Sequence, residues 1–199
     1  MVNPIHFRKG SENKVAAVFS CPGRIEEREC CPAAGTTGRN LERLLAILRL
    51  NEKSKIKAVR KEITITNSWN KIEYLGKNGK RSEATTEEIL DSANLERLAQ
   101  EVANVEEYVL CFGDKAYLAI CTLKAQGKLN SECKIIYTRH LSSRSINQVT
   151  HDMKGQEILA APIARQQGDT RSIKAIENDN SVRRLAVIAK EIIDSHSDG

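Results

Sequence analysis

The pattern of apolar and polar positions along the chain predicts short strands that alternate with helices. Compact runs of apolar or β-branched residues are typical of strands, and apolar residues three and four positions apart are typical of helices. The predicted strands are 14–20, 62–68, 107–112 and 134–139. The predicted helices are 37–50, 85–102, 114–126 and 181–194. Thr37 and Thr85 are expected to cap the first two helices. An exposed loop is predicted over 71–81, and residues 154–177 carry no clear pattern.

Strands that alternate with helices are typical of parallel β-α-β units. We therefore expect an α/β fold, a three-layer α/β/α sandwich around a central, mainly parallel four-stranded sheet. No internal repeat or linker-like stretch divides the chain, so residues 1–199 are expected to form a single domain.

Three segments lie at the carboxyl ends of predicted strands. They are Cys21-Pro22-Gly23, Thr66-Asn67-Ser68 and His140-Leu141-Ser142-Ser143. Ligands of open parallel sheets bind beyond the carboxyl ends of the strands. We therefore expect these segments to meet at one site, although they are far apart in the sequence.

Composition and charge agree with a water-soluble domain. Apolar residues make up 40% of the 199 positions and charged residues 29%, and no apolar run is long enough to span a bilayer. The first residues lack the apolar stretch of a secretory signal, so a cytoplasmic protein without a membrane partner is expected. The net charge of +5 permits a nucleic-acid backbone as partner without requiring one.

The six cysteines are interpreted as small hydrophobic residues of the interior rather than as ligands or disulfides. No C-x-x-C pair is present, which leaves little support for a zinc or iron–sulphur site. Cys111 in a predicted strand and Cys121 on a predicted helix are expected in the core. We therefore expect no metal and no cofactor.

The stretch CPGRIEERECCPAAGTTGRNL, residues 21–41, resembles the first motif of the iron–sulphur branch of the uracil-DNA glycosylase superfamily. In that motif a P-G pair is followed by an acidic pair, a P-F-x-G segment, and then [ST]-G-x-x-L. The chain places Pro22-Gly23, Glu26-Glu27, 32–35, Thr37-Gly38 and Leu41 over these positions without a gap.

Three further segments are similar to motifs of the same superfamily, and they occur in the same order. Thr66-Asn67 matches a strand-end T-N pair, and the segment 110–116 resembles an L-G-x-x-A strand–helix junction. His140-Leu141-Ser142-Ser143-Arg144 resembles H-P-S-P-L, the loop that pinches the DNA backbone. The cysteines that bind the cluster in that branch are absent, so no iron–sulphur cluster is expected.

The resemblance implies a DNA glycosylase, which would act on a nucleotide flipped out of a duplex or on single-stranded DNA. Asn67 would read the pairing edge of a pyrimidine, and His140 would donate to a base oxygen that gains charge as the glycosidic bond breaks. Ser142, Ser143 and Arg144 would contact phosphates, and Arg144 could instead replace a wedging leucine.

The residues by themselves leave plainer interpretations open. His140 could be a surface histidine, Asn67 a turn residue at the end of a strand, and Glu26-Glu27 a solvated pair. Trp69 could supply a stacking surface for the base or belong to the core.

Four positions depart from the superfamily pattern. Ser20 replaces a glutamate, and Cys21 stands where other branches have an acidic or amide residue, so the usual water-activating group is missing. Glu26, Glu27 or Asn67 could compensate for it, or the reaction could be largely dissociative, and Cys21 is a further candidate for the catalytic role. Ala33 replaces an aromatic residue, and Gly23 replaces the tyrosine that one branch uses to exclude 5-methyl groups.

Both of the latter changes remove bulk from a base pocket expected to include Ser20, Pro22, Gly23, Ala33 and Trp69. Loss of base stacking on a ring would cost on the order of 1–3 kcal/mol for uracil. A pyrimidine with a bulky 5-substituent, such as the glucosylated hydroxymethylcytosine of some phage DNA, fits the larger space. Such an enzyme would serve phage defence.

Three alternatives to that enzyme are a uracil or mismatch glycosylase of base-excision repair, a DNA-binding protein without catalytic activity, and a nucleotide hydrolase of similar architecture. The sequence does not contain a P-loop or a dinucleotide-binding glycine motif that would favour the last of these. We expect a monomer.

Overall fold

The chain has an α/β fold with a five-stranded, mostly parallel sheet packed by helices. The computed structural model describes residues 4–77 and 81–195. The strands are β1 (Phe7–Arg8), β2 (Val15–Phe19), β3 (Thr64–Asn67), β4 (Tyr108–Phe112) and β5 (Lys134–Thr138). The helices are α1 (Arg24–Glu29), α2 (Gly35–Leu50), α3 (Thr86–Ile89), α4 (Ser92–Val102), α5 (Asp114–Ala125), α6 (Ser143–Ile146), α7 (Ala161–Gln166) and α8 (Ile173–Asp194).

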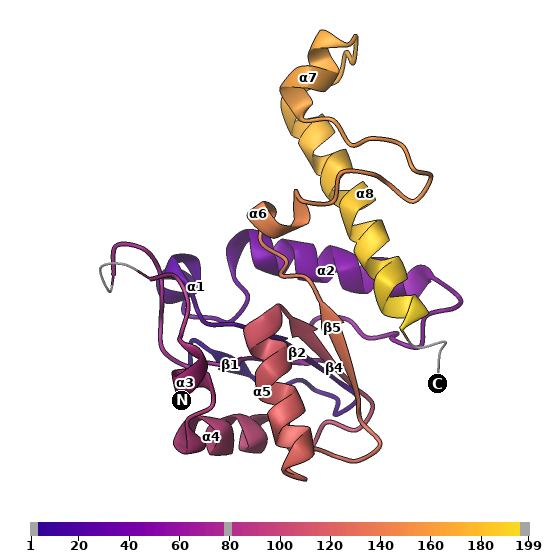
Figure 1. Cartoon of the computed structure of the whole chain (residues 1–199). Coiled ribbons are helices and arrows are strands. Elements are labelled where there is room, and N and C mark those ends of the chain that lie inside the picture. The colour runs from indigo at the N-terminus through magenta and orange to yellow at the C-terminus, as the bar shows by residue number, and fades with distance from the viewer. Residues whose placement is uncertain (1–3, 78–80, 196–199) are drawn as a thin grey trace.

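The sheet has the strand order β1-β3-β2-β4-β5 (Figure 1). Strands β2 to β5 are parallel and correspond to the four predicted runs. The expectation of four strands is wrong by one, because β1 pairs antiparallel with the outer side of β3. Only Phe7 and Arg8 form β1, and two residues are too few to produce a periodic pattern.

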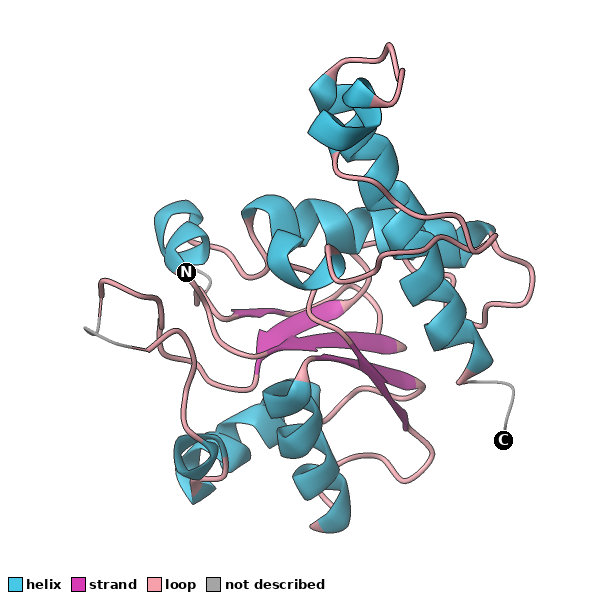
Figure 2. Ribbon diagram, turned by 45° about the horizontal axis from the view of Figure 1, so that its top comes forward, coloured by secondary structure: helices cyan, strands magenta, loops and turns pink. Residues whose placement is uncertain are grey.

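Helices pack on both faces of the sheet (Figure 2). Successive side chains along each strand point to opposite faces of the pleated sheet. Ala17, Phe19 and Leu110 belong to the apolar cluster shared with α2 and α8. Ala16 and Val18 belong to the cluster shared with α4 and α5. The burial of β2 on both faces explains why its residues form a continuous apolar run rather than an alternating one.

The helices predicted over 85–102 and 37–50 differ from the structure. The helix predicted over 85–102 is two helices, because Leu90 ends α3 and the Asp91 side chain accepts from the backbone N–H groups of Ala93 and Asn94 to start α4. Thr85 caps α3 as predicted. Helix α2 begins at Gly35 with Ala34 as its N-cap, so Thr37 lies inside its first turn.

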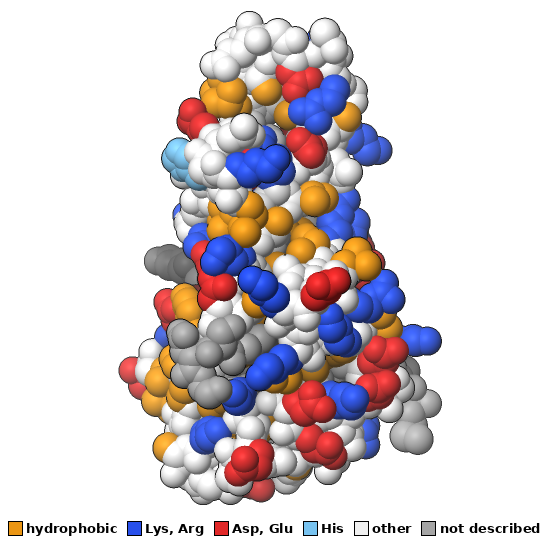
Figure 3. Space-filling model, turned by 90° about the vertical axis from the view of Figure 1, so that its right-hand side faces the viewer, with side chains coloured by type: hydrophobic (Ala, Val, Ile, Leu, Met, Phe, Trp, Pro, Cys, Tyr) orange, Lys and Arg blue, Asp and Glu red, His pale blue; other side chains and the backbone are white. Residues whose placement is uncertain are grey.

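The helices that the sequence did not predict lack an apolar face at helical spacing. Helix α1 buries none of its residues, and α6 and α7 span four and six residues. Helix α8 begins at Ile173 rather than 181, and its first turns project beyond the sheet together with α7 (Figure 1). On the side where α8 lies, basic and acidic side chains are mixed (Figure 3).

The cysteines are all reduced in the structure, and their exposure varies. Cys111 and Cys133 are buried, as small hydrophobic residues would be. Cys121, expected in the core, is only half-buried, and Cys30 is exposed at the end of α1. None of the helices in the described part of the chain combines the length and the apolar composition needed to cross a lipid bilayer.

Candidate functional site

A cavity of about 470 Å³ lies beyond the carboxyl ends of β2 and β3, next to the loop that follows β5. Most of the residues predicted from the sequence line it. These are Ser20, Cys21, Gly23, Glu26, Ala33, Asn67, His140, Ser142 and Arg144. The three loops that follow the strands therefore converge, as the parallel arrangement of their strands requires.

Three predicted site residues do not line this cavity. Trp69 is only 6% exposed and packs in the apolar cluster under α4 and α5, so it cannot stack on a ligand here. Pro22 is buried, and its carbonyl oxygen accepts from the backbone N–H of Glu73. Ser143 is exposed at the start of α6, outside the cavity.

Asn67 is fixed at the end of β3, and its side chain has no hydrogen-bond partner among the described residues. Its backbone carbonyl accepts from the Arg97 guanidinium at 3.1 Å, and the same guanidinium contacts the carbonyl of Ser68 at 3.1 Å. The Asn67 side chain is 3% exposed, and its buried Oδ1 accepts no hydrogen bond from the described residues. A buried acceptor left unpaired costs about 1–3 kcal/mol, and a ligand donor would remove that cost.

His140 lines the cavity, and one of its two ring nitrogens is already hydrogen-bonded. Its Nδ1 accepts from the backbone N–H of Ser142 at 3.0 Å, which places the proton of the neutral ring on Nε2. Burial lowers the pKa of His140, although the charge of Glu83 opposes this effect. The ring packs edge-on against Phe19, with centroids 5.7 Å apart. His140 is therefore a neutral ring whose Nε2–H is available as a donor.

A hydrogen bond joins the loop after His140 to helix α2. The buried Asn40 amide donates to the Leu141 carbonyl at 2.8 Å. Because α2 is packed on the sheet, this bond fixes the loop that carries His140 against the core.

The loop between α1 and α2 is held around Ala33. This residue has a left-handed backbone with φ of 49°, and Arg60 donates to its carbonyl at 2.9 Å. A Cβ at Gly38 would lie 2.1 Å from the same carbonyl oxygen, so only glycine permits this approach. Glu26 accepts from the backbone N–H groups of Gly23 and Ala34, each at 3.0 Å. Glu26 thus braces the loop from within the cavity wall.

Cys21 lines the cavity as a protonated thiol. Burial, with contributions from Glu83 and Glu73, raises the pKa of Cys21 to about 12. Its Sγ lies 3.6 Å from the carbonyl oxygen of Ser82. A thiol in this state neither removes a proton from water nor attacks a substrate at neutral pH. The chemistry of Cys21 therefore does not support the catalytic role considered for it.

The sequence did not single out five further lining residues as site residues: Phe19, Thr37, Glu73, Ser82 and Glu83. Glu73 belongs to the predicted exposed loop 71–81, and Ser82 and Glu83 follow that loop, in a short stretch before α3 for which no structure was predicted. The Arg81 guanidinium forms hydrogen bonds with both carboxylate oxygens of the buried Glu73, at 2.6 and 3.2 Å, and also contacts Glu88. A Glu–Arg pair eight positions apart in a loop gives no recognisable sequence signal, because its meaning depends on how the loop folds back.

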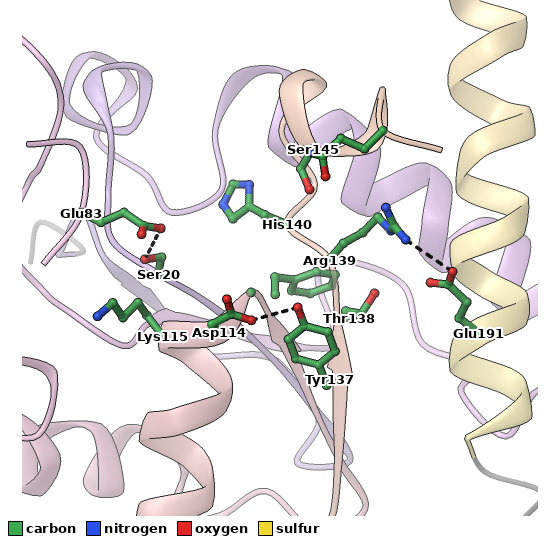
Figure 4. Close-up of a pocket in the computed structure, with 13 residues that line it drawn as sticks. Ser20, Glu83, Asp114, Lys115, Tyr137, Thr138, Arg139, His140, Ser145 and Glu191 are labelled. Atoms are coloured by element: carbon green, nitrogen blue, oxygen red, sulfur yellow. Dashed lines mark hydrogen bonds and ion pairs between the residues drawn. The ribbon is translucent and has the colours of Figure 1, made fainter. Parts of the chain in front are cut away.

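A second cavity, of about 680 Å³, adjoins the first at the carboxyl ends of β4 and β5 (Figure 4). The two cavities share Ser20, Glu83 and His140. The walls of the second are polar, and several of its groups are paired across it. Tyr137 donates to Asp114 at 2.9 Å, and Ser20 donates to Glu83 at 3.0 Å (Figure 4).

The described residues contain no cluster of three or more His, Cys, Asp or Glu side chains placed to hold a metal ion. Three glutamates, Glu26, Glu73 and Glu83, line the first cavity, whereas Arg144 is its one lining cation among the described residues. This balance disfavours a bound anion inside the cavity and favours a neutral ligand or one that gains positive charge. Comparison with protein-family models and with curated proteins found no match to this chain.

Proposed function

We propose that this chain is a DNA glycosylase, similar to the uracil-DNA glycosylase superfamily, that removes a pyrimidine base and leaves an abasic site. The observation that carries the proposal is the convergence of Asn67 and His140 in one cavity. One contributes an unpaired buried acceptor and the other a neutral N–H donor. A pyrimidine presents the complementary groups, a ring or exocyclic N–H on its pairing edge and a carbonyl oxygen.

These two groups suit the charges that develop when an N-glycosidic bond breaks. The base leaves with the bonding electrons, and a neutral His140 Nε2–H stabilises the negative charge that accumulates on its oxygen. The sugar becomes positively charged, which the glutamates around the cavity favour. A donor that the fold already holds in place costs little reorganisation during the reaction.

The space around Ala33 supports a base larger than uracil. Ala33 lines the cavity, and Trp69 is in the core. The aromatic ring among the described lining residues, Phe19, is already stacked on Phe112 and packed edge-on against His140. The adjoining polar cavity shares three wall residues with the first. A substituent that extends from the base therefore has room in this second cavity. A pyrimidine with a bulky, polar 5-substituent is therefore the substrate class that we propose.

The DNA strand would lie over the rim formed by α6 and the residues before it. Ser142, exposed Ser143 and exposed Arg144 stand there, and Arg144 also lines the cavity mouth. Contacts of this kind position a phosphate backbone without reading its sequence.

The proposal is tested with duplex and single-stranded oligonucleotides that contain uracil, cytosine, hydroxymethylcytosine or glucosylated hydroxymethylcytosine. Abasic sites are counted after alkaline cleavage. Abasic product from the glucosylated or hydroxymethylated strands supports the proposal. Product from uracil alone would refute the large-base assignment, and DNA binding without any product would refute the enzyme.

A further inference from the structure

The carboxylates on the cavity wall differ in how their oxygens are engaged. Glu26 uses both oxygens to accept the backbone N–H groups of Gly23 and Ala34. Glu73 is buried, and both of its oxygens accept from Arg81. Neither can turn toward a ligand without releasing the loop that it holds. Glu26 and Glu73 are therefore structural carboxylates.

Glu83 is the exception among these glutamates. Its side chain is exposed, and one oxygen accepts from the Ser20 hydroxyl at 3.0 Å. Its other oxygen has no hydrogen-bond partner within the described ranges 4–77 and 81–195. Glu83 lies on the wall shared by the two cavities, with His140 across from it (Figure 4). The Ser20 hydroxyl fixes the carboxylate beside the space where a ligand would lie.

Resting on the proposed function, we propose that Glu83 is the catalytic carboxylate, oriented by Ser20, that receives a proton from the attacking water. The bond between the base nitrogen and C1′ of the deoxyribose breaks, and its electron pair leaves with the base. The water oxygen forms a bond to C1′ as one of its protons passes to Glu83. That proton then goes to the base, so the products are a free base and an abasic sugar with a C1′ hydroxyl.

The surroundings of Glu83 suit this role better than those of Cys21. The thiol of Cys21 stays protonated at neutral pH, since burial and the nearby Glu83 charge raise its pKa to about 12. The Glu83 charge also acts on His140, where it opposes the lowering of the pKa by burial. Glu83 and His140 both line the two adjoining cavities, so a sugar bound between them would lie beside the carboxylate.

The test compares Glu83→Gln with Glu87→Gln, a matched change of an exposed glutamate four residues later that lines none of the described cavities. Single-turnover excision is measured on whichever base the wild-type protein releases, and the Kd for the same DNA is measured by fluorescence anisotropy. Glu83→Gln should slow excision by about 10²-fold or more and leave the Kd nearly unchanged. Glu87→Gln should leave both unchanged.

Chemical rescue separates a catalytic carboxylate from a structural one. Added sodium formate should restore part of the activity of Glu83→Ala, because formate can occupy the vacated space, and it should not accelerate the wild type or Glu87→Gln. Excision by Glu83→Gln within about threefold of wild type would overturn the assignment, while wild-type activity would preserve the proposed function. A rate loss matched by an equal loss of DNA affinity would overturn it too. A wild type inactive on every base would refute both proposals.

Discussion

Two buried asparagines, Asn94 in α4 and Asn67 at the end of β3, allow a sharp test, because the structure assigns them opposite roles. The Asn94 amide donates to the carbonyls of Ser68 and Ile89 at 2.8 and 2.9 Å, and its oxygen accepts from Arg97 at 2.9 Å. The Asn67 side chain forms no hydrogen bond with the described residues, and its Oδ1 is buried and unpaired. The first holds the fold together, and the second is available for a ligand.

The expected stability changes follow from these contacts. At about 1 kcal/mol for each of three hydrogen bonds, Asn94→Ala should lower the free energy of unfolding by about 3 kcal/mol. Asn67→Ala removes an unpaired acceptor whose burial costs about 1–3 kcal/mol, and it enlarges an existing cavity rather than creating a sealed one. Its free energy of unfolding should therefore stay the same or rise by up to about 2 kcal/mol.

The assay is urea unfolding of both variants beside the wild type, with base excision measured on the same preparations. With a slope of about 2 kcal/mol per molar urea, Asn94→Ala should move the midpoint down by about 1.5 M, and Asn67→Ala should not lower it. Asn67→Ala should nevertheless slow excision by about 10²-fold or more. If Asn67→Ala were destabilised as much as Asn94→Ala, its amide would be structural and the reasoning about the site would be refuted.

Three further predictions concern the pocket, the loss of stability at acidic pH and the backbone. Ala33→Phe should shift the preference between small and substituted bases toward the small ones by about tenfold in kcat/KM, and an unchanged ratio would show that Ala33 does not contact the base. Burial lowers the pKa of His140 below its ordinary value of 6.5, so the unfolded chain binds this proton first as the pH falls. The contribution of neutral His140 to the free energy of unfolding is complete above pH 6.5 and is lost as the pH falls toward the pKa of the folded state. His140→Gln should remove this pH-dependent loss, which urea titrations at several pH values measure. Cys30 ends α1 in the left-handed backbone region, with φ of 49°. In urea unfolding, Cys30→Gly should therefore raise the free energy of unfolding by about 0.5–1 kcal/mol. Cys31→Gly lies outside that backbone region and should lower the free energy of unfolding.

The sequence predicted the elements that carry a long apolar pattern and missed those that do not. Strand β2 buries all of its residues, and helix α2 buries leucines at helical spacing along one face, so hydrophobic spacing reveals both of them. Helix α1 buries no residue, and the first turns of α8 project from the body, so neither has the apolar spacing on which prediction depends. The break between α3 and α4 had a signal, because Asp91 is a strong N-cap residue placed within the predicted helix.

The candidate site was predictable where a residue follows a strand, and not where a loop folds back. Asn67 and His140 lie at strand ends, so the parallel sheet brings them together whatever the intervening sequence does. Trp69 is two residues farther along, and the side on which its ring packs is decided by the apolar surface of α4. Glu83 reaches the cavity after a loop that folds back on the residues following β2: the Glu73 N–H donates to the Pro22 carbonyl and the Ser20 hydroxyl donates to Glu83, contacts that no local pattern encodes.

The departures at Ser20 and Ala33 fit together once the loops are placed. A longer acidic side chain at Ser20 would compete for the space beside His140 that Glu83 occupies, whereas a serine hydroxyl orients that carboxylate. The small Ala33 is held in a left-handed conformation by Arg60 and by the close approach of Gly38, so the cavity is kept open by backbone contacts rather than by chance. In the proposed glycosylase, the acidic group would come from one loop and the open space from another, so the base that is accepted could change without disturbing Asn67 and His140. Variants at Ala33 should therefore alter base preference, and variants at Glu83 should alter the rate for every base alike.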